Sequence, residues 1–97
     1  MITSSQRDRL CSMAQQINTI YEIGKSDIGA GEIIDISIAL DLHELIKISI
    51  SRDATTDAKT FLNAICALTG AEPVTSSDNE VVIYRRSASN EVKHIEI

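Results

Sequence analysis

The sequence predicts an α+β fold in which two amphipathic helices pack on one face of an antiparallel sheet, in the order α-β-β-α-β-β. Two observations favour it. Apolar residues recur every three or four positions in two segments, 5–23 and 56–69, and they alternate with polar residues in the segment between. The 97 residues, 43% of them hydrophobic and 24% charged, suit a single domain spanning 1–97. A sheet beneath two helices is the simplest arrangement that buries both apolar stripes.

The first predicted helix covers about residues 5–23. Ser4 or Ser5 can accept a hydrogen bond from the first free N–H groups of this helix, and Gly24 can adopt the left-handed conformation that ends a helix. Gly29 and Gly31 follow in a loop. They favour a flexible connection over a phosphate-binding loop, because the third glycine, the lysine and the following helix of such loops are missing. The apolar stripe of the helix consists of Leu10, Met13, Ala14, Ile17, Ile20 and Tyr21.

Residues 32–52 predict a β-hairpin that reverses near residues 41–44. Large aliphatic residues occupy every second position, which is the period of a strand with one buried face. They are Ile34, Ile36, Ile38 and Leu40 before the reversal, and Ile46, Ile48 and Ile50 after it. The opposite face carries small and polar residues, and it suits water or a partner; among these residues are Asp35, Ser37, Lys47 and Ser49.

The second predicted helix, 56–69, ends at Gly70, and Pro73 prevents its resumption. Two further strands are expected at 80–86 and 91–97, joined by a turn. The last strand leaves an open sheet edge, which predicts either a homodimer through that edge or a strand added to a partner's sheet.

The charge distribution is one-sided. The net charge is −5, and the segment 27–44 contains five carboxylates and no lysine or arginine. Two interpretations remain: a solvated face that keeps the domain soluble, or a docking surface for a basic groove on a partner protein. The carboxylates of this acidic segment are Asp27, Glu32, Asp35, Asp41 and Glu44.

Direct binding to nucleic acid is not expected. A nucleic-acid-binding protein normally shows a basic stripe that neutralises phosphates, and aromatic residues on which bases stack. Here only 3% of the residues are aromatic, and the clustered cations are two pairs of arginines. A weak nucleic-acid-binding module is the alternative if the fold brings the four together. They are Arg7, Arg9, Arg85 and Arg86.

Neither a catalytic nor a metal site is expected. The two histidines, His43 and His94, have no partner at the spacing that metal ligands show. The two cysteines, Cys11 and Cys66, lie in the predicted helices beside apolar neighbours and are expected as buried thiols, although a small enzyme using Cys11 is a further alternative. No cofactor is therefore expected. The chain also lacks an apolar run of the ~20 residues that a membrane helix needs, which predicts a cytoplasmic protein.

Together these patterns favour a small, acidic, non-enzymatic protein that binds another protein through the acidic segment. A short, acidic chain without cofactor is also the general type of virus- or mobile-element-encoded inhibitors that occupy a basic nucleic-acid-binding groove of a host defence complex. A structural or accessory subunit of a larger assembly is the alternative, beside the arginine-based module.

Overall fold

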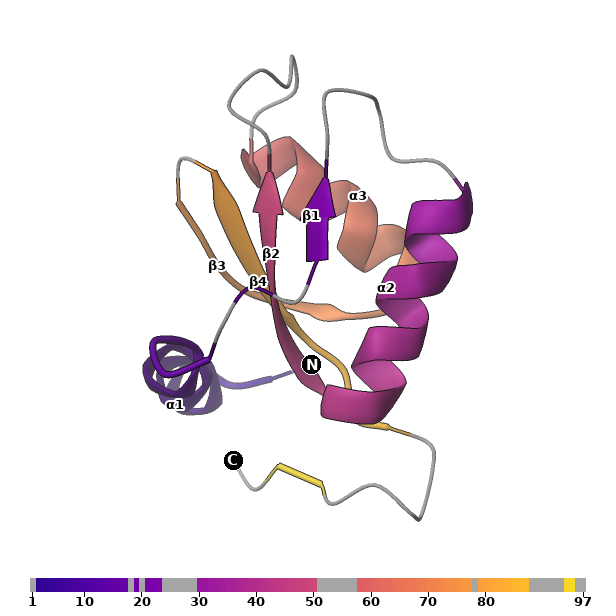
Figure 1. Ribbon diagram of the computed structural model, residues 1–97. Helices are drawn as coiled ribbons and strands as arrows, with labels where there is room; N and C mark the ends of the chain where they lie inside the picture. The colour runs from indigo at the N-terminus through magenta and orange to yellow at the C-terminus, as the bar shows by residue number, and fades with distance from the viewer. Residues whose placement is uncertain are drawn as a thin grey trace.

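The structure is a computed structural model in which helices flank both faces of one sheet (Figure 1). It describes residues 2–17, 19, 21–23, 30–50, 58–77, 79–87 and 94–95. The elements in chain order are α1 (Ser4–Ala14), β1 (Tyr21–Ile23), α2 (Ala30–His43), β2 (Leu45–Ile50), α3 (Ala58–Thr69), β3 (Glu72–Ser76) and β4 (Glu80–Tyr84).

The four strands form one mixed sheet with the order β1-β2-β4-β3. The pairs β2–β4 and β4–β3 are antiparallel, whereas the short edge strand β1 runs parallel to β2. Parallel neighbours need a crossover connection, and α2 supplies it. A bulge between Pro73 and Thr75 interrupts the pairing of β3, an edge strand in which a proline is tolerated.

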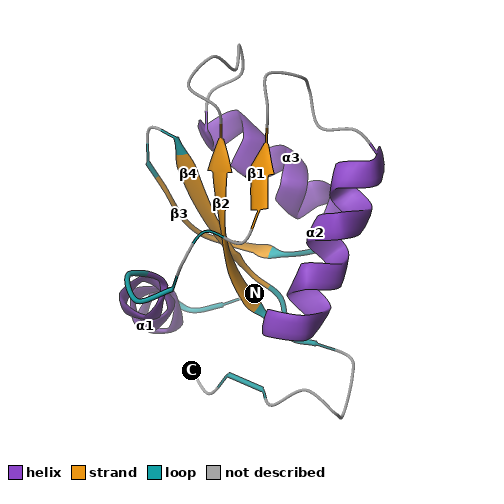
Figure 2. Cartoon of the chain, viewed as in Figure 1, coloured by secondary structure: helices purple, strands orange, loops and turns teal. Residues whose placement is uncertain are grey.

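The two sheet faces carry separate hydrophobic clusters. Figure 2 shows α2 and α3 on one side of the sheet and α1 on the other. Along β2, Ile46, Ile48 and Ile50 face α2 and α3, while Leu45 packs in the cluster with Leu10 of α1. Alternate residues of a strand point to opposite faces, so β2 is buried on both sides at this end. We call the two sides the α2/α3 face and the α1 face.

The prediction of a hairpin over 32–52 is wrong, because residues up to His43 form α2 and only the second half is a strand. Isoleucines at every second position also fit a helix, because residues four positions apart lie on the same side of it. Ile36 and Leu40 are buried completely, whereas three others on the outer side of α2 remain exposed. These are Ile34 (59%), Ile38 (54%) and Leu42 (60%).

The predicted α+β class is confirmed, but the order of elements is not α-β-β-α-β-β. The first helix ends at Ala14 and not near residue 23, because residues 21–23 form β1. It is capped by Thr3, whose hydroxyl accepts a hydrogen bond from the N–H of Gln6 at 3.1 Å. The two predicted helices correspond to α1 and α3, which lie on opposite faces of the sheet and not on one.

The C-terminal half of the prediction is confirmed in part. The second helix is present as α3, with Gly70 after it at a φ of 75°, and β4 matches the strand expected at 80–86. On the edge side, β4 pairs with β3 and not with a strand at 91–97. The strand β3 is not predicted by the sequence, because Pro73 indicates only the end of a helix. Of the expected strand 91–97 and the turn before it, only His94 and Ile95 are described, and they are not in a strand; the rest lies outside the described residues. Over the described ranges, no helix is long and apolar enough to cross a membrane.

Candidate nucleic-acid interface

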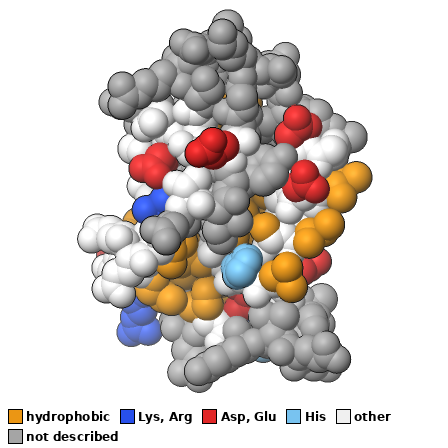
Figure 3. Space-filling model, viewed as in Figure 1, with side chains coloured by type: hydrophobic (Ala, Val, Ile, Leu, Met, Phe, Trp, Pro, Cys, Tyr) orange, Lys and Arg blue, Asp and Glu red, His pale blue; other side chains and the backbone are white. Residues whose placement is uncertain are grey.

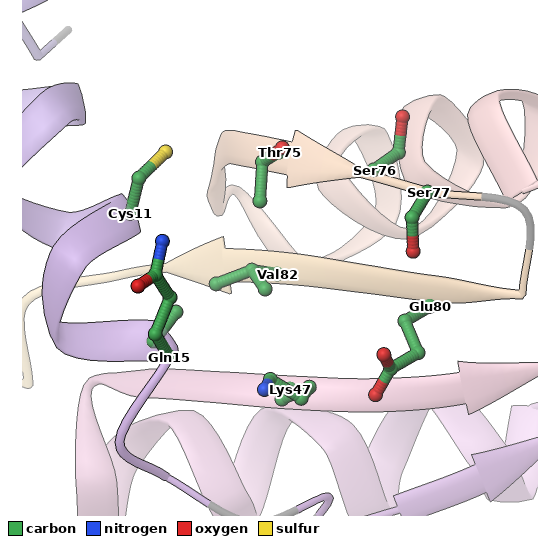
Figure 4. A pocket seen from close by; sticks show the side chains of 9 residues that line it. Cys11, Gln15, Lys47, Thr75, Ser76, Ser77, Glu80 and Val82 are labelled. Carbon is green, nitrogen blue, oxygen red and sulfur yellow. The ribbon is translucent and has the colours of Figure 1, made fainter.

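The helix α1 covers only part of its sheet face and leaves a groove beside it. Leu10 and Ala14 pack on one end of the sheet, against a set that includes Val82 and Tyr84. Beyond this contact a hollow of about 210 Å³ lies between the end of α1, β2 and the β3–β4 hairpin. We call it the α1 groove. Its polar lining residues are Gln15, Lys47, Thr75, Ser76, Ser77 and Glu80 (Figure 4).

The strand register places Lys47 and Glu80 on the same face of the sheet. Lys47 pairs with Val82, and Ser49 pairs with Glu80, so Lys47 and Glu80 are diagonal neighbours on adjacent antiparallel strands. Figure 4 shows the Glu80 side chain extending from β4 over β2, the strand that carries Lys47. Glu80 Oε2 accepts a hydrogen bond from the Thr19 hydroxyl at 3.3 Å. A cation and a carboxylate therefore share one small groove.

One side of α1 brings further polar groups to the same junction. Arg7, Cys11 and Gln15 follow one another at four-residue spacing and so lie on one side of the helix. The Arg7 Nε donates to the carbonyl oxygen of Pro73 at 3.2 Å, and the Cys11 Sγ lies 3.8 Å from the carbonyl oxygen of Val74. This side of α1 therefore follows β3, from Arg7 at one end to Gln15 in the groove.

The four arginines named as an alternative site do not converge. Arg85 turns to the α2/α3 face, where its Nη1 donates to the carbonyl oxygen of Thr69 at 2.6 Å. Its Nη2 donates to the carbonyl oxygen of Ser37 at 3.0 Å and to Asp41 Oδ1 at 3.0 Å. Arg7 belongs to α1 on the other face. Arg85 thus connects α2 with the end of α3 through these hydrogen bonds. Arg9 and Arg86 are exposed.

The acidic segment is also divided, and the placement of Glu44 on a surface is wrong. Glu44 follows α2 in a left-handed conformation, with a φ of 65°, and is completely buried. Its Oε2 accepts from the backbone N–H of Ser87 and lies 2.6 Å from His94 Nδ1, and its Oε1 accepts from the N–H of Ile95. Sequence reasoning missed this contact because the partners lie about 50 residues away.

The surroundings of Glu44 act on its charge in two directions. Burial raises the pKa of the carboxyl, but the hydrogen bonds from His94, Ile95 and Ser87 and the charge of His94 together hold that pKa below its ordinary value. The ionised Glu44 therefore fastens the chain near residues 94–95 to the end of α2.

The remaining acidic residues lie on α2 or outside the described residues. Asp35 and Asp41 are exposed, and Asp41 pairs with Arg85 at 3.0 Å, while Glu32 is half-buried in the first turn. In Figure 3 carboxylates and exposed apolar side chains gather on the side of the molecule where α2 lies. Asp27 is not among the described residues. A protein-docking role for these carboxylates stays a prediction.

The groups considered for metal or thiol chemistry do not assemble in the described part of the chain. No group there of three or more histidine, cysteine or carboxylate residues could hold a metal ion. His43 lines a second hollow of about 420 Å³ whose other walls include Met13, Ile17 and Leu45. Burial, together with the charge of Glu72, raises the pKa of the Cys66 thiol to about 11, which suits an inert thiol.

Comparison with known proteins gives one family. The model of the CRS1 / YhbY (CRM) domain matches residues 2–85. The "Probable RNA-binding protein YqeI" of Bacillus subtilis is 30% identical over 97 residues, which cover 100% of this chain and 99% of that protein. An "RNA-binding protein" of Haemophilus influenzae is 26% identical over 92 residues, covering 95% of this chain and 93% of that protein. The solution structure of a hypothetical protein from Staphylococcus aureus, suggested to bind RNA, has a TM-score of 0.79 and 32% identity, covering 98% of this chain and 100% of that one.

These similarities contradict the function predicted from the sequence. A protein-binding inhibitor of a host defence complex is wrong, and so is the expectation that direct nucleic-acid binding is unlikely, since the relatives are named as RNA-binding proteins. The expectation was wrong because it applied the net charge, and the lack of a basic stripe in the sequence, to the whole surface of the protein. The total charge of −5 says little about a single groove on a surface where the charges are spread unevenly.

Proposed function

Because the chain belongs to the CRS1 / YhbY (CRM) domain family, we propose that it binds RNA, and that the α1 groove is where it does so. The relatives that match over nearly the whole chain are named as RNA-binding proteins. The observation that carries the choice of surface is the half-covered sheet face, where Lys47 and the donors of Gln15 and Ser76 line one hollow. Hydrogen-bond donors and a cation on an open sheet suit RNA strands.

The size and chemistry of the groove favour a single strand. A hollow of about 210 Å³ is smaller than the ~300–1,000 Å³ pockets of drug-sized ligands and suits one small group such as an unstacked base. Bases are available in this way in single-stranded loops, bulges and ends of RNA. The strand would run along the junction of α1 and β3, with its phosphates near Arg7 and Lys47.

Few cations take part, so the affinity should depend weakly on salt. For a single strand, the slope of log K against log salt is about −0.7 for each phosphate neutralised. With Arg7 and Lys47 as the contacts, we expect a slope of about −1.4. A slope several times steeper would show that a larger basic surface is used and would contradict the choice of groove.

Replacement of Lys47 tests the groove directly. The variant Lys47→Gln removes one positive charge from the groove, and Lys59→Gln removes one from the exposed surface of α3, on the other side of the sheet. Fluorescence anisotropy with a labelled single-stranded RNA of ten nucleotides measures the affinity of each.

We expect Lys47→Gln to weaken binding about tenfold, because a charge-assisted contact is lost. Lys59→Gln should stay within about twofold of the unchanged protein, since exposed charges away from the contact act only through a screened field. Equal losses in the two variants would place the RNA elsewhere. No binding by the unchanged protein would contradict RNA binding itself.

A further inference from the structure

The α1 groove contains an acceptor that a phosphate-binding surface would not need. Glu80 is half-buried at the open end of the groove, beside the β3–β4 turn. The exposed Glu22 on β1 lies in the same row of the sheet, because both residues pair with Ser49 from opposite sides. Two carboxylates in one row repel phosphate. This end of the groove therefore suits the edge of a base rather than the sugar-phosphate backbone.

The groove offers one strong acceptor and one strong donor side by side. An ionised carboxylate only accepts hydrogen bonds, and its two oxygens have about four lone-pair sites, so the bond from Thr19 leaves sites for a ligand. Lys47, the diagonal neighbour of Glu80, only donates. A ligand that fits must present donors to Glu80 and an acceptor to Lys47 along the same edge.

Guanine meets this requirement better than the other bases. Its Watson–Crick edge carries two adjacent donors, N1–H and the 2-amino group, which match the two oxygens of a carboxylate, and the acceptor O6 next to them. Adenine and cytosine offer a carboxylate one amino group, and uracil offers one N–H. Resting on the proposed RNA binding, we infer that the α1 groove selects a guanine in single-stranded RNA. Glu80 binds N1–H and the 2-amino group, and Lys47, whose ammonium has three donors, binds O6 as well as the neighbouring phosphate.

The experiment compares RNA strands that differ in one base. Four ten-nucleotide strands carry guanine, inosine, adenine or uracil at the centre of an otherwise all-uracil sequence. Their affinities for the unchanged protein, for Glu80→Gln and for Asp35→Asn are measured by fluorescence anisotropy. Asp35→Asn is the matched control, because it removes the same charge from the exposed outer surface of α2. A thermal melt of each variant checks that it is folded.

We expect the unchanged protein to bind the guanine strand about tenfold more tightly than the uracil strand, which is the discrimination of a good bidentate contact. Inosine, which lacks the 2-amino group, should lose part of this preference. Glu80→Gln should reduce the preference to less than about threefold, because an amide offers one acceptor where the carboxylate offers two. Asp35→Asn should retain it.

The outcomes separate this inference from the proposed function. If all four strands bind with equal affinity, guanine selection is overturned while RNA binding stands. A guanine preference that Glu80→Gln leaves intact would also overturn it. Equal affinity for guanine and inosine would contradict the contact to the 2-amino group and therefore the bidentate arrangement. This comparison uses only the unchanged protein. If no strand binds, RNA binding fails and the guanine site fails with it.

Discussion

Replacing Glu44 by glutamine should destabilise the protein strongly, although the two side chains have nearly the same size. The carboxylate is completely buried and accepts from the N–H groups of Ser87 and Ile95 and interacts with His94, each at 2.6 Å. A glutamine presents one oxygen and one NH₂ group. In its better orientation the oxygen keeps Ser87 and His94, and the NH₂ group then faces the N–H of Ile95, donor against donor.

The expected loss follows from these contacts. An unsatisfied buried donor costs about 1–3 kcal/mol, and a hydrogen bond to a charged group contributes about 1.5–3 kcal/mol. We expect Glu44→Gln to lower the free energy of unfolding by about 2–4 kcal/mol, a large share of the ~5–15 kcal/mol typical of a domain. The exposed pair of Asp41 with Arg85 provides the control, because Asp41→Asn should cost no more than about 1 kcal/mol.

The loss should also depend on pH in a defined direction. The folded protein holds the pKa of Glu44 below its ordinary value. Stabilisation by this carboxylate is therefore fully present above the unfolded pKa of about 4.3 and is lost as the pH falls through the lower folded pKa. The difference between the unchanged protein and Glu44→Gln should shrink in acid.

Urea unfolding followed by circular dichroism, at pH 7 and at several acidic pH values, measures these free energies. A loss of less than about 0.5 kcal/mol at pH 7 would refute the reasoning, since it would mean that the three contacts do not hold an ionised carboxylate. A large loss of unfolding free energy that stays constant down to low pH would contradict the ionised state of Glu44, although the side chain would still be needed for stability.

Three other changes test the fold and the thiol. Gly70→Ala should cost about 1–2 kcal/mol in urea unfolding, because Gly70 ends α3 with a φ of 75°; no loss would show that this conformation is not required. Ile36→Ala should cost about 2–5 kcal/mol and Ile38→Ala less than about 1 kcal/mol, since only Ile36 is buried; equal losses would favour the hairpin over α2. With its pKa raised to about 11, Cys66 in a Cys11→Ser variant should react with iodoacetamide at pH 8 about tenfold more slowly than free cysteine, because the loss of thiolate outweighs the higher nucleophilicity of a more basic thiolate; a similar rate would contradict the raised pKa.

The strongest local signals predicted the elements correctly. The helix α3 was expected from a regular apolar stripe, and Gly70 ends it as predicted. The strand β4 lies within the strand expected at 80–86, and its run of β-branched residues suits a strand. Both elements follow from short-range preferences that the surrounding fold supports.

The segment that became α2 shows where such preferences are insufficient. Isoleucine at every second position is typical of a strand with one buried face. A helix over the same segment leaves Ile34, Ile38 and Leu42 exposed, so the pattern alone favours the strand. What decides the structure is the parallel pairing of β1 with β2, which requires a crossover between them. That pairing involves only the three residues Tyr21–Ile23, which the sequence pattern assigned to the first predicted helix.

The candidate site was visible in part. Of the four residues expected on a polar sheet face, Lys47 and Ser49 do share a face of β2 with Leu45. The other two, Asp35 and Ser37, lie on α2 instead. Glu80 was missed because its relation to Lys47 depends on the pairing of β2 with β4 across more than thirty residues. The buried contact of Glu44 with His94 depends in the same way on distant parts of the chain.

The central claim, that RNA binds in the α1 groove, is tested most directly by nuclear magnetic resonance. Backbone amide signals of the ¹⁵N-labelled protein are followed while a single-stranded RNA of ten nucleotides is added. We predict that the shifts cluster at Gln15, Lys47, residues 75–77 and Glu80, and that Asp35 and Lys59 on the other side of the sheet stay unchanged. Shifts confined to α2 and α3, with the groove signals unmoved, would contradict the account.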